Sequence, residues 1–333
     1  MKLSELQARF QAAKVLVVGD LMLDEYLLGT VSRISPEAPV PVLDVKSRTH
    51  VAGGAANVAV NIRTLSGVVT LVGMVSGDAA GEHLRRILGG WGVSLSGLVD
   101  SGARGTICKT RIIAGQQQIV RIDHEDRSVL SMEVQAKIAA TTFALLPEHD
   151  ICVLSDYAKG TLSDSVCKSV IESAKAFGKP VIVDPKGKLF QKYRGCSIIT
   201  PNLNEAAVAV GISIEDQHTL LEAGRQLMVA LPGTRVLITR GADGMTLFSD
   251  SYEPITVPAL ARRVFDVVGA GDTVVATLAL ALGSGLSSEV SMRLATVAAS
   301  IVVGKPGTAT TTIKELFENE DYDRVVQQSS AMA

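Results

Sequence analysis

Asp266-Val267-Val268-Gly269-Ala270-Gly271-Asp272-Thr273 is the stretch around which the chain is organised. The apolar run from Val274 to Leu282 follows it and predicts a buried helix. Gly269 and Gly271 allow backbone conformations and close approaches that other residues do not. The first amides of a helix have no partners within it, and the helix dipole adds partial positive charge there. The turn therefore predicts an anion site beside the carboxylate of Asp272.

An amide cradle next to a fixed carboxylate suits phosphoryl transfer. The amides of Ala270, Gly271 and Asp272 would stabilise the moving phosphoryl group, and the carboxylate would take the proton from the attacking hydroxyl. Taken alone, the turn fits equally well an Asp that only caps a buried helix. The choice depends on the rest of the chain.

Length and charge limit the classes of protein that the chain can represent. Its 333 residues allow one large α/β domain or two smaller ones. A net charge of -2 does not suggest binding to nucleic acid or to a membrane surface. No apolar run is long enough to span a bilayer, and the N-terminus does not resemble a signal peptide. The four cysteines form no CxxC pair. We therefore expect a cytoplasmic protein with reduced cysteines and no nucleic-acid or membrane partner.

Polar or glycine residues follow the end of each of five predicted strands. Strands that alternate with helices predict a mostly parallel sheet, and ligands bind at the carboxyl ends of such strands. Five such ends are hard to explain as packing. The segments concerned are Gly19-Asp20, Ser155-Asp156, Asp184 to Gly187, Thr200 to Glu205 and Thr239 to Gly244.

Two β segments interrupt this alternation, at about residues 26–50 and 104–123. The first contains Pro36, Pro39 and Pro41, which is typical of edge or exposed strands, and the second predicts a hairpin around Ala114-Gly115. We expect the two segments to pair as a small sheet that covers the site as a lid. Exposed sheets of this size seldom stand alone in water, so we also expect two lids to pack together in a homodimer.

Three motifs now occur in a fixed order along the chain: Gly53-Gly54-Ala55-Ala56-Asn57, Asn202-Leu203-Asn204-Glu205 and Gly269-Ala270-Gly271-Asp272. With them the sequence resembles the ribokinase-like, or PfkB, carbohydrate kinases. The resemblance implies one domain over residues 1–333, with a three-layer α/β fold, a mostly parallel central sheet and a small β lid. It also implies ATP, Mg²⁺ and a monovalent cation such as K⁺, although Val268 stands where the family usually has Thr.

Within this family the sequence is most similar to the kinases of D-glycero-β-D-manno-heptose 7-phosphate. Stretches such as Ser35 to Val42, Thr106 to Arg111, Ser155 to Gly160 and Asp184 to Gly187 carry this likeness. It implies ATP-dependent phosphorylation of the anomeric hydroxyl to the 1,7-bisphosphate, on the way to ADP-heptose for the lipopolysaccharide core. Such kinases are often fused to an adenylyltransferase. Because the chain ends at Ala333 without an HxGH-type motif, we expect the stand-alone kinase.

The resemblance and the chemistry together assign roles to individual residues. Asp272 is the expected base, with Gly269, Ala270 and Gly271 in the anion hole. Glu205 would hold Mg²⁺ indirectly. As an alternative, Asn202 and Glu205 would only cap the start of a helix. ATP is expected at Asn202, Leu203, Asn204, Glu205, Thr239, Gly241 and Gly244. Sugar hydroxyls need carboxylates and amides, which Asp20, Asp24, Gly53, Gly54, Asn57 and Asp184 offer, although Asp20 and Asp24 also fit loop caps.

The remote phosphate of the sugar needs cations. Arg104 and Lys186 are the favoured candidates among a set that also contains Lys109, Arg111, Arg121 and Lys159. Two other functions remain open: a kinase of this fold for another sugar, sugar phosphate or nucleoside, and a nucleotide-binding dehydrogenase or sensor. Against the second, the first strand ends in Gly-Asp-Leu-Met-Leu-Asp and lacks GxGxxG.

Overall fold

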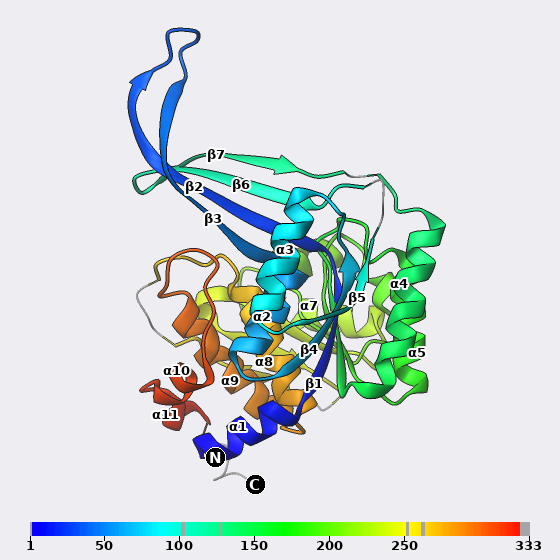
Figure 1. Cartoon of the computed structure of the whole chain (residues 1–333). Coiled ribbons are helices and arrows are strands. Elements are labelled where there is room, and N and C mark those ends of the chain that lie inside the picture. Colours follow the sequence, from blue (N-terminus) through cyan, green and yellow to red (C-terminus); the bar gives the residue numbers. More distant parts are fainter. Residues whose placement is uncertain (1, 101–103, 127, 251–252, 261–263, 327–333) are drawn as a thin grey trace.

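The computed structural model describes residues 2–100, 104–126, 128–250, 253–260 and 264–326. Within these residues nine strands form the central sheet (Figure 1). β12 runs antiparallel to both of its neighbours, and the other pairs are parallel. The order across the sheet is β13 (Ile255–Val257), β12 (Met245–Phe248), β11 (Arg235–Thr239), β10 (Ile198–Ile199), β9 (Val181–Asp184), β8 (Ile151–Ser155), β1 (Lys14–Gly19), β4 (Val68–Met74) and β5 (Ser94–Val99).

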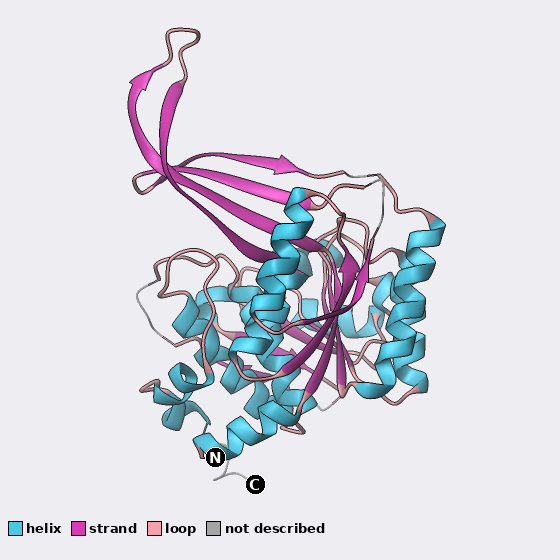
Figure 2. Ribbon diagram, in the orientation of Figure 1, coloured by secondary structure: helices cyan, strands magenta, loops and turns pink. Residues whose placement is uncertain are grey.

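Helices cover both faces of this sheet (Figure 2). The alternation of side chains along β1 shows why, since Val15 and Val17 enter one buried cluster while Leu16 and Val18 enter the other. One face is covered by α1 (Leu3–Ala12), α2 (Ala55–Thr64), α3 (Ala79–Gly90), α8 (Ala270–Gly283), α9 (Ser288–Val302), α10 (Ile313–Glu318) and α11 (Tyr322–Val326). The other face is covered by α4 (Met132–Leu145), α5 (Asp164–Ala176), α6 (Leu203–Val210) and α7 (Gln217–Ala230).

This is the predicted three-layer α/β fold with a mostly parallel sheet, and that prediction is confirmed. Some boundaries differ from those expected. The strand that precedes Thr200 is confined to Ile198–Ile199, and the helix expected from Val274 begins at Ala270. The earlier start places Asp272 in the first turn of α8. None of the helices described combines the length and apolar character that a bilayer crossing requires.

A second sheet of four strands projects from the body of the molecule (Figure 1), and we call it the small sheet. Its order is β3 (Pro41–Gly54), β2 (Leu21–Ile34), β6 (Ile107–Ala114) and β7 (Gln117–His124). β2 runs parallel to β6, so the two β segments of the sequence share one sheet. β2 begins one residue after β1, and β3 leads directly into α2. The base of the small sheet is therefore anchored in the central sheet, where the strand ends meet.

Candidate active site

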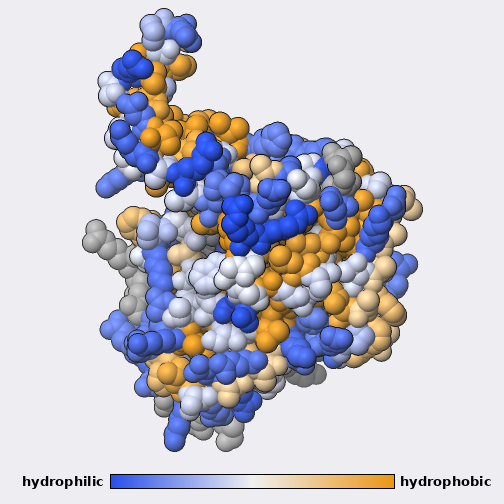
Figure 3. All heavy atoms as spheres, in the orientation of Figure 1, coloured by the Kyte–Doolittle hydropathy of each residue, from blue (hydrophilic) through white to orange (hydrophobic). Residues whose placement is uncertain are grey.

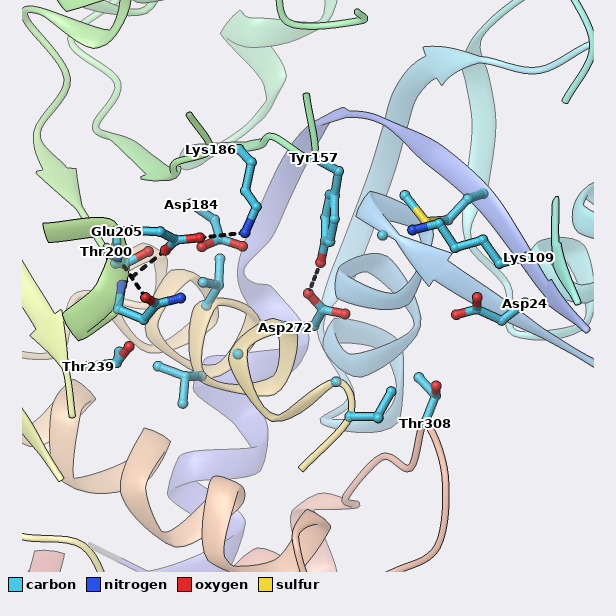
Figure 4. A pocket seen from close by; sticks show the side chains of 18 of the residues that line it. Asp24, Lys109, Tyr157, Asp184, Lys186, Thr200, Glu205, Thr239, Asp272 and Thr308 are labelled. Atoms are coloured by element: carbon cyan, nitrogen blue, oxygen red, sulfur yellow. Dashed lines mark hydrogen bonds and ion pairs between the residues drawn. The ribbon is translucent and has the colours of Figure 1, made fainter. Parts of the chain in front are cut away.

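A cavity of about 290 Å³ lies where the carboxyl ends of the central strands meet the base of the small sheet and the start of α8 (Figure 4). Four of the five polar strand ends singled out in the sequence contribute to its wall or to the loop beside it, and the small sheet contributes from β2 and β6. The lining residues are Met22, Asp24, Gly54, Lys109, Arg111, Tyr157, Asp184, Lys186, Thr200, Asn202, Glu205, Thr239, Val268, Gly269, Gly271, Asp272, Val274, Val275 and Thr308.

The start of α8 presents unpaired amides to this cavity. Gly269 is the N-cap residue and has φ 79°, a left-handed conformation that favours glycine. Among the described residues, no hydrogen bond engages the amides of Gly271 and Asp272, and a Cβ built on Gly271 would meet nothing within 4 Å. The amide of Ala270 instead donates to the Val267 carbonyl at 3.2 Å. The expected cradle of three amides is therefore reduced to two open amides.

Asp272 is buried, with 7% of its surface exposed, and two side chains donate to its carboxylate. The Tyr157 hydroxyl donates to Oδ1, and Asn57 Nδ2 donates to Oδ2 at 2.6 Å (Figure 4 draws the Tyr157 contact). Asn61 in turn donates to the Asn57 carbonyl oxygen at 3.0 Å and accepts from the Thr273 hydroxyl at 2.8 Å. These contacts link α2 to α8 and fix the orientation of the carboxylate.

The environment of Asp272 sets its protonation near neutrality. Burial raises the pKa of the Asp272 carboxyl to about 6, while the hydrogen bonds from Tyr157 and Asn57 oppose that rise. Burial, and then the charge of Asp272, raise the pKa of the Tyr157 hydroxyl well above its usual value, so this hydroxyl stays a donor. At pH 7 and above the carboxylate is therefore mostly ionised and able to accept a proton.

The small sheet and the turn into α2 form the side of the cavity expected for the sugar. Asp24 lines it and pairs with Arg111 at 2.6 Å between Oδ1 and Nη1. A Cβ on Gly53 would lie 2.6 Å from Asp24 Oδ2, so glycine leaves room for that carboxylate. Gly54 lines the cavity with φ 59°. Gly53 and Asn57 do not line it; Gly53 packs behind Asp24, and Asn57 holds Asp272.

Asp20 differs from its expected role as a sugar contact. It is fully buried, and its two oxygens accept hydrogen bonds from the backbone amides of Tyr157, Lys159 and Thr161 at 2.9–3.0 Å. It therefore fixes the loop after β8, as in the loop-cap alternative. Through this loop Asp20 places Tyr157 against Asp272.

Arg104 also lies outside the cavity lining, although it was a favoured phosphate ligand. Its side chain is buried, and Nη2 donates to the carbonyl oxygens of Asp126 and Lys159, the latter at 2.7 Å. The guanidinium thus supports the same loop from behind. Because the guanidinium is buried against this loop, it does not face the cavity in which a phosphate ligand was expected.

Asn202 and Glu205 form a capping box at the start of α6. Asn202 Oδ1 accepts from the Glu205 amide at 2.9 Å, and Glu205 Oε2 accepts from the Asn202 amide at 3.0 Å. Both side chains also line the cavity, and Glu205 Oε1 accepts from Lys186 Nζ at 2.7 Å. The helix cap and the cavity position therefore coexist. Lys186, expected at the sugar phosphate, lies on the Glu205 side of the cavity (Figure 4).

The remaining residues expected at ATP divide into cavity walls and supports. Thr239 lines the cavity, whereas Gly241 and Gly244 build the tight turn between β11 and β12 with positive φ values. Leu203 packs partly against the apolar cluster beneath α6, and Asn204 is exposed; neither lines the cavity. Only Asn202, Glu205 and Thr239 of this group thus face the site.

Asp184 lies in the cavity at the end of β9, as predicted. Burial, followed by the charges of Asp272 and Glu205, raises the pKa of its carboxyl well above the usual value. The described residues contain no cluster of three His, Cys, Asp or Glu side chains that could hold a metal. The oxygens of Asp184, Asn202 and Glu205 nevertheless suit Mg²⁺, which proteins hold through one or two carboxylates together with substrate phosphates.

Several cavity residues had no role assigned from the sequence. Tyr157 follows the strand end Ser155-Asp156 and lies in the stretch from Ser155 to Gly160 that carries the likeness to heptose 7-phosphate kinases, and Thr200 precedes the Asn202 motif. Thr308 belongs to a loop after α9, and its hydroxyl lies 3.1 Å from the Tyr26 hydroxyl of the small sheet. Nothing in the local sequence marks Thr308, because its contact spans most of the chain.

Comparison with known proteins identifies the family of the chain. Residues 12–315 match the model of the pfkB family carbohydrate kinases, so the chain belongs to that family and is a sugar kinase. As such it uses ATP with a divalent metal. Its fold is that of ribokinase from Arabidopsis thaliana (TM-score 0.75, 24% identity, 92% of this chain and 98% of that one) and of phosphofructokinase-2 from Escherichia coli (TM-score 0.77, 20% identity, 96% and 99%).

Similar curated proteins carry the name "Bifunctional protein HldE". The one from Desulfatibacillum aliphaticivorans is 46% identical over 92% of this chain, and the one from Gluconacetobacter diazotrophicus is 47% identical over 92%. The chain spans 63% and 64% of the length of these two relatives. The match therefore covers only part of each relative.

Proposed function

We propose that the protein transfers the γ-phosphoryl group of ATP to the anomeric hydroxyl of D-glycero-β-D-manno-heptose 7-phosphate. The product would be the 1,7-bisphosphate, a precursor of ADP-heptose for the lipopolysaccharide core. The resemblance of the sequence to heptose 7-phosphate kinases supports this substrate, as do the relatives named HldE at 41–47% identity.

One observation carries the proposal. The Asp272 carboxylate is held by two donors in the first turn of α8, beside the open amides of Gly271 and Asp272. The sugar hydroxyl gives its proton to this carboxylate as its oxygen attacks the γ-phosphorus of ATP, and the bond to the β-phosphate oxygen breaks to release ADP. The open amides stabilise the charge on the phosphoryl oxygens during transfer.

The ends of the cavity suit the two substrates. ATP would lie along Asn202, Glu205 and Thr239, with Lys186 at its phosphates, and the sugar would lie against Asp24 and Gly54. Mg²⁺, held through Asp184 and Glu205, would neutralise charge on the ATP phosphates when bound. A monovalent cation such as K⁺ would bind near Asp266, whose oxygens accept the amides of Val268 and Gly307 and thereby order this loop.

A substrate panel tests the proposal. ADP release is measured with heptose 7-phosphate, unphosphorylated heptose, fructose 6-phosphate, fructose, ribose and adenosine, for the wild type and Asp272→Asn. We expect heptose 7-phosphate to give the highest kcat/KM, and Asp272→Asn to lose turnover by at least about 10³-fold while keeping its ATP affinity. Full activity in Asp272→Asn, or preference for another acceptor, would sink the assignment.

We also propose that the small sheet acts as a lid and that two lids pack together in a homodimer. Hydrophobic residues gather on the projecting sheet (Figure 3), and its exposed members include Ile34, Val45, Val120 and Ile122. Apolar side chains on an unpaired sheet favour a partner of the same kind. Sedimentation at micromolar concentration should give a dimer, and Ile122→Lys should shift it toward monomer; a wild-type monomer argues against this.

A further inference from the structure

The cations that line the cavity differ in their partners. Among the described residues these are Lys109, Arg111 and Lys186. Lys186 pairs with Glu205 at 2.7 Å, and Arg111 pairs with Asp24 at 2.6 Å. Within the same described residues the Lys109 ammonium forms neither a hydrogen bond nor an ion pair, although the side chain is half-buried. A partly buried charge without a counterion is costly, which points to a ligand.

The carboxylates near Lys109 are already engaged. Asp24 lies opposite Lys109 on β2, and Asp123 lies opposite it on β7. Asp24 is paired with Arg111. The carboxylate of Asp123 accepts hydrogen bonds from Nε and Nη2 of Arg121, at 2.7 and 2.9 Å.

The other neighbouring cation is also neutralised. Lys159 pairs with Glu125 at 2.6 Å. In each of the three ion pairs around Lys109 the two charges cancel, so the positive charge of Lys109 is left in excess.

We propose that Lys109 binds the phosphate group that the sugar substrate carries at the end remote from its reacting hydroxyl. This inference rests on the proposed function, since it assigns a residue to the phosphate of a sugar phosphate. It replaces Arg104, which is buried behind the loop after β8, and Lys186, which lies beside Glu205 on the side of the cavity proposed for ATP.

The electrostatics and the layout of the site agree with this role. Burial, and then the positive charge of Lys159, lower the pKa of the Lys109 ammonium, and a phosphate dianion would relieve both effects. In Figure 4 Asp272 lies between Lys109 on one side and Lys186 with Glu205 on the other. The phosphate of the sugar and the phosphates of ATP would therefore bind to opposite sides of the base, which limits their repulsion.

Kinetics with paired substrates test the assignment. kcat/KM is measured for heptose 7-phosphate and for unphosphorylated heptose, with the wild type, Lys109→Gln, Lys109→Arg and the control Lys46→Gln, an exposed residue of β3 outside the cavity. We expect Lys109→Gln to lose about 10- to 100-fold with the phosphate substrate, mainly through KM, and to change little with heptose. Lys109→Arg should recover part of the loss.

An equal loss with both substrates, or no loss, overturns the inference while leaving the kinase assignment intact. If the wild type does not phosphorylate heptose 7-phosphate, the proposed function fails, and a second measurement still decides the role of Lys109. Acetylation of Lys109 by acetic anhydride is followed by peptide mass spectrometry with and without inorganic phosphate. Protection of Lys109 but not of Lys46 supports an anion site, and equal labelling of Lys109 with and without phosphate overturns it.

Discussion

Replacing Tyr157 with Phe removes one of the two hydrogen bonds that hold the carboxylate of Asp272, the proposed base. The hydroxyl donates to Asp272 Oδ1, and the substitution removes one oxygen atom while keeping the ring. Tyr157 and Asn57 are the groups that lower the pKa of Asp272 against the effect of burial, which nonetheless raises it to about 6. With one donor gone, the ionised carboxylate is less stabilised and its pKa must rise.

The size of the shift follows from the strength of the bond. A hydrogen bond to a charged group contributes about 1.5–3 kcal/mol, and one pKa unit corresponds to about 1.4 kcal/mol. Tyr157→Phe should therefore move the pKa of Asp272 upward by about 1 to 2 units. Because the base acts when ionised, activity falls as the pH drops through this pKa. The acidic limb of the profile should move to higher pH.

The assay is kcat/KM for the sugar measured from pH 5 to 9, since this ratio reports the ionisation of the free enzyme. We expect an acidic limb at about pH 6 in the wild type and at about pH 7 to 8 in Tyr157→Phe. Tyr322→Phe is a matched control, because Tyr322 is buried in α11 and does not line the cavity. Superimposed acidic limbs for Tyr157→Phe and the wild type would refute this account of how the base is tuned.

Three further changes test other parts of the site. Asp272→Asn should stabilise the fold at pH 7 by up to about 3 kcal/mol. An acid whose pKa is raised in the folded state keeps its proton where the unfolded chain has lost it, so the stability of the wild type falls as the pH rises from about 4 to 6. Thermal unfolding of the two proteins should therefore show that the gain in Asp272→Asn disappears toward about pH 4. Glu205→Gln removes the partner of Lys186 and should lower kcat/KM for ATP by about 10- to 100-fold; an unchanged value would exclude Glu205 from the ATP site. Gly53→Ala places a Cβ 2.6 Å from Asp24 Oδ2 and should raise the KM for the sugar by about 10-fold with little effect on that for ATP, whereas equal effects on both would contradict a sugar-side position.

The sequence predicts the layered fold and the place of the site because both depend on local patterns. Apolar runs such as Lys14 to Val18 predict buried parallel strands, and polar residues follow each of these strands at one edge of the sheet. The Gly269 turn is likewise local, since an open helix start needs only small residues at fixed spacing. The structure therefore contains the predicted strands and the open helix start, with small changes in their boundaries.

The roles of single side chains depend on contacts that no local pattern encodes. Asp20 accepts three amides because the loop after β8 folds back onto it, 137 to 141 positions along the chain. Tyr157 reaches Asp272 from a different strand end, and Asn57 reaches it from α2. The partners of long cations are equally non-local, since Lys186 pairs with Glu205 and Arg104 donates to the carbonyl oxygen of Lys159.

The identity of the product decides whether the protein phosphorylates the anomeric hydroxyl of heptose 7-phosphate. Wild-type protein is incubated with ATP, Mg²⁺ and D-glycero-β-D-manno-heptose 7-phosphate, and the products are followed by ³¹P NMR. We predict one new phosphate resonance, coupled to the anomeric proton, that grows in step with ADP and is absent with Asp272→Asn. ADP formed without an anomeric phosphate, or a phosphate on another carbon, would contradict it.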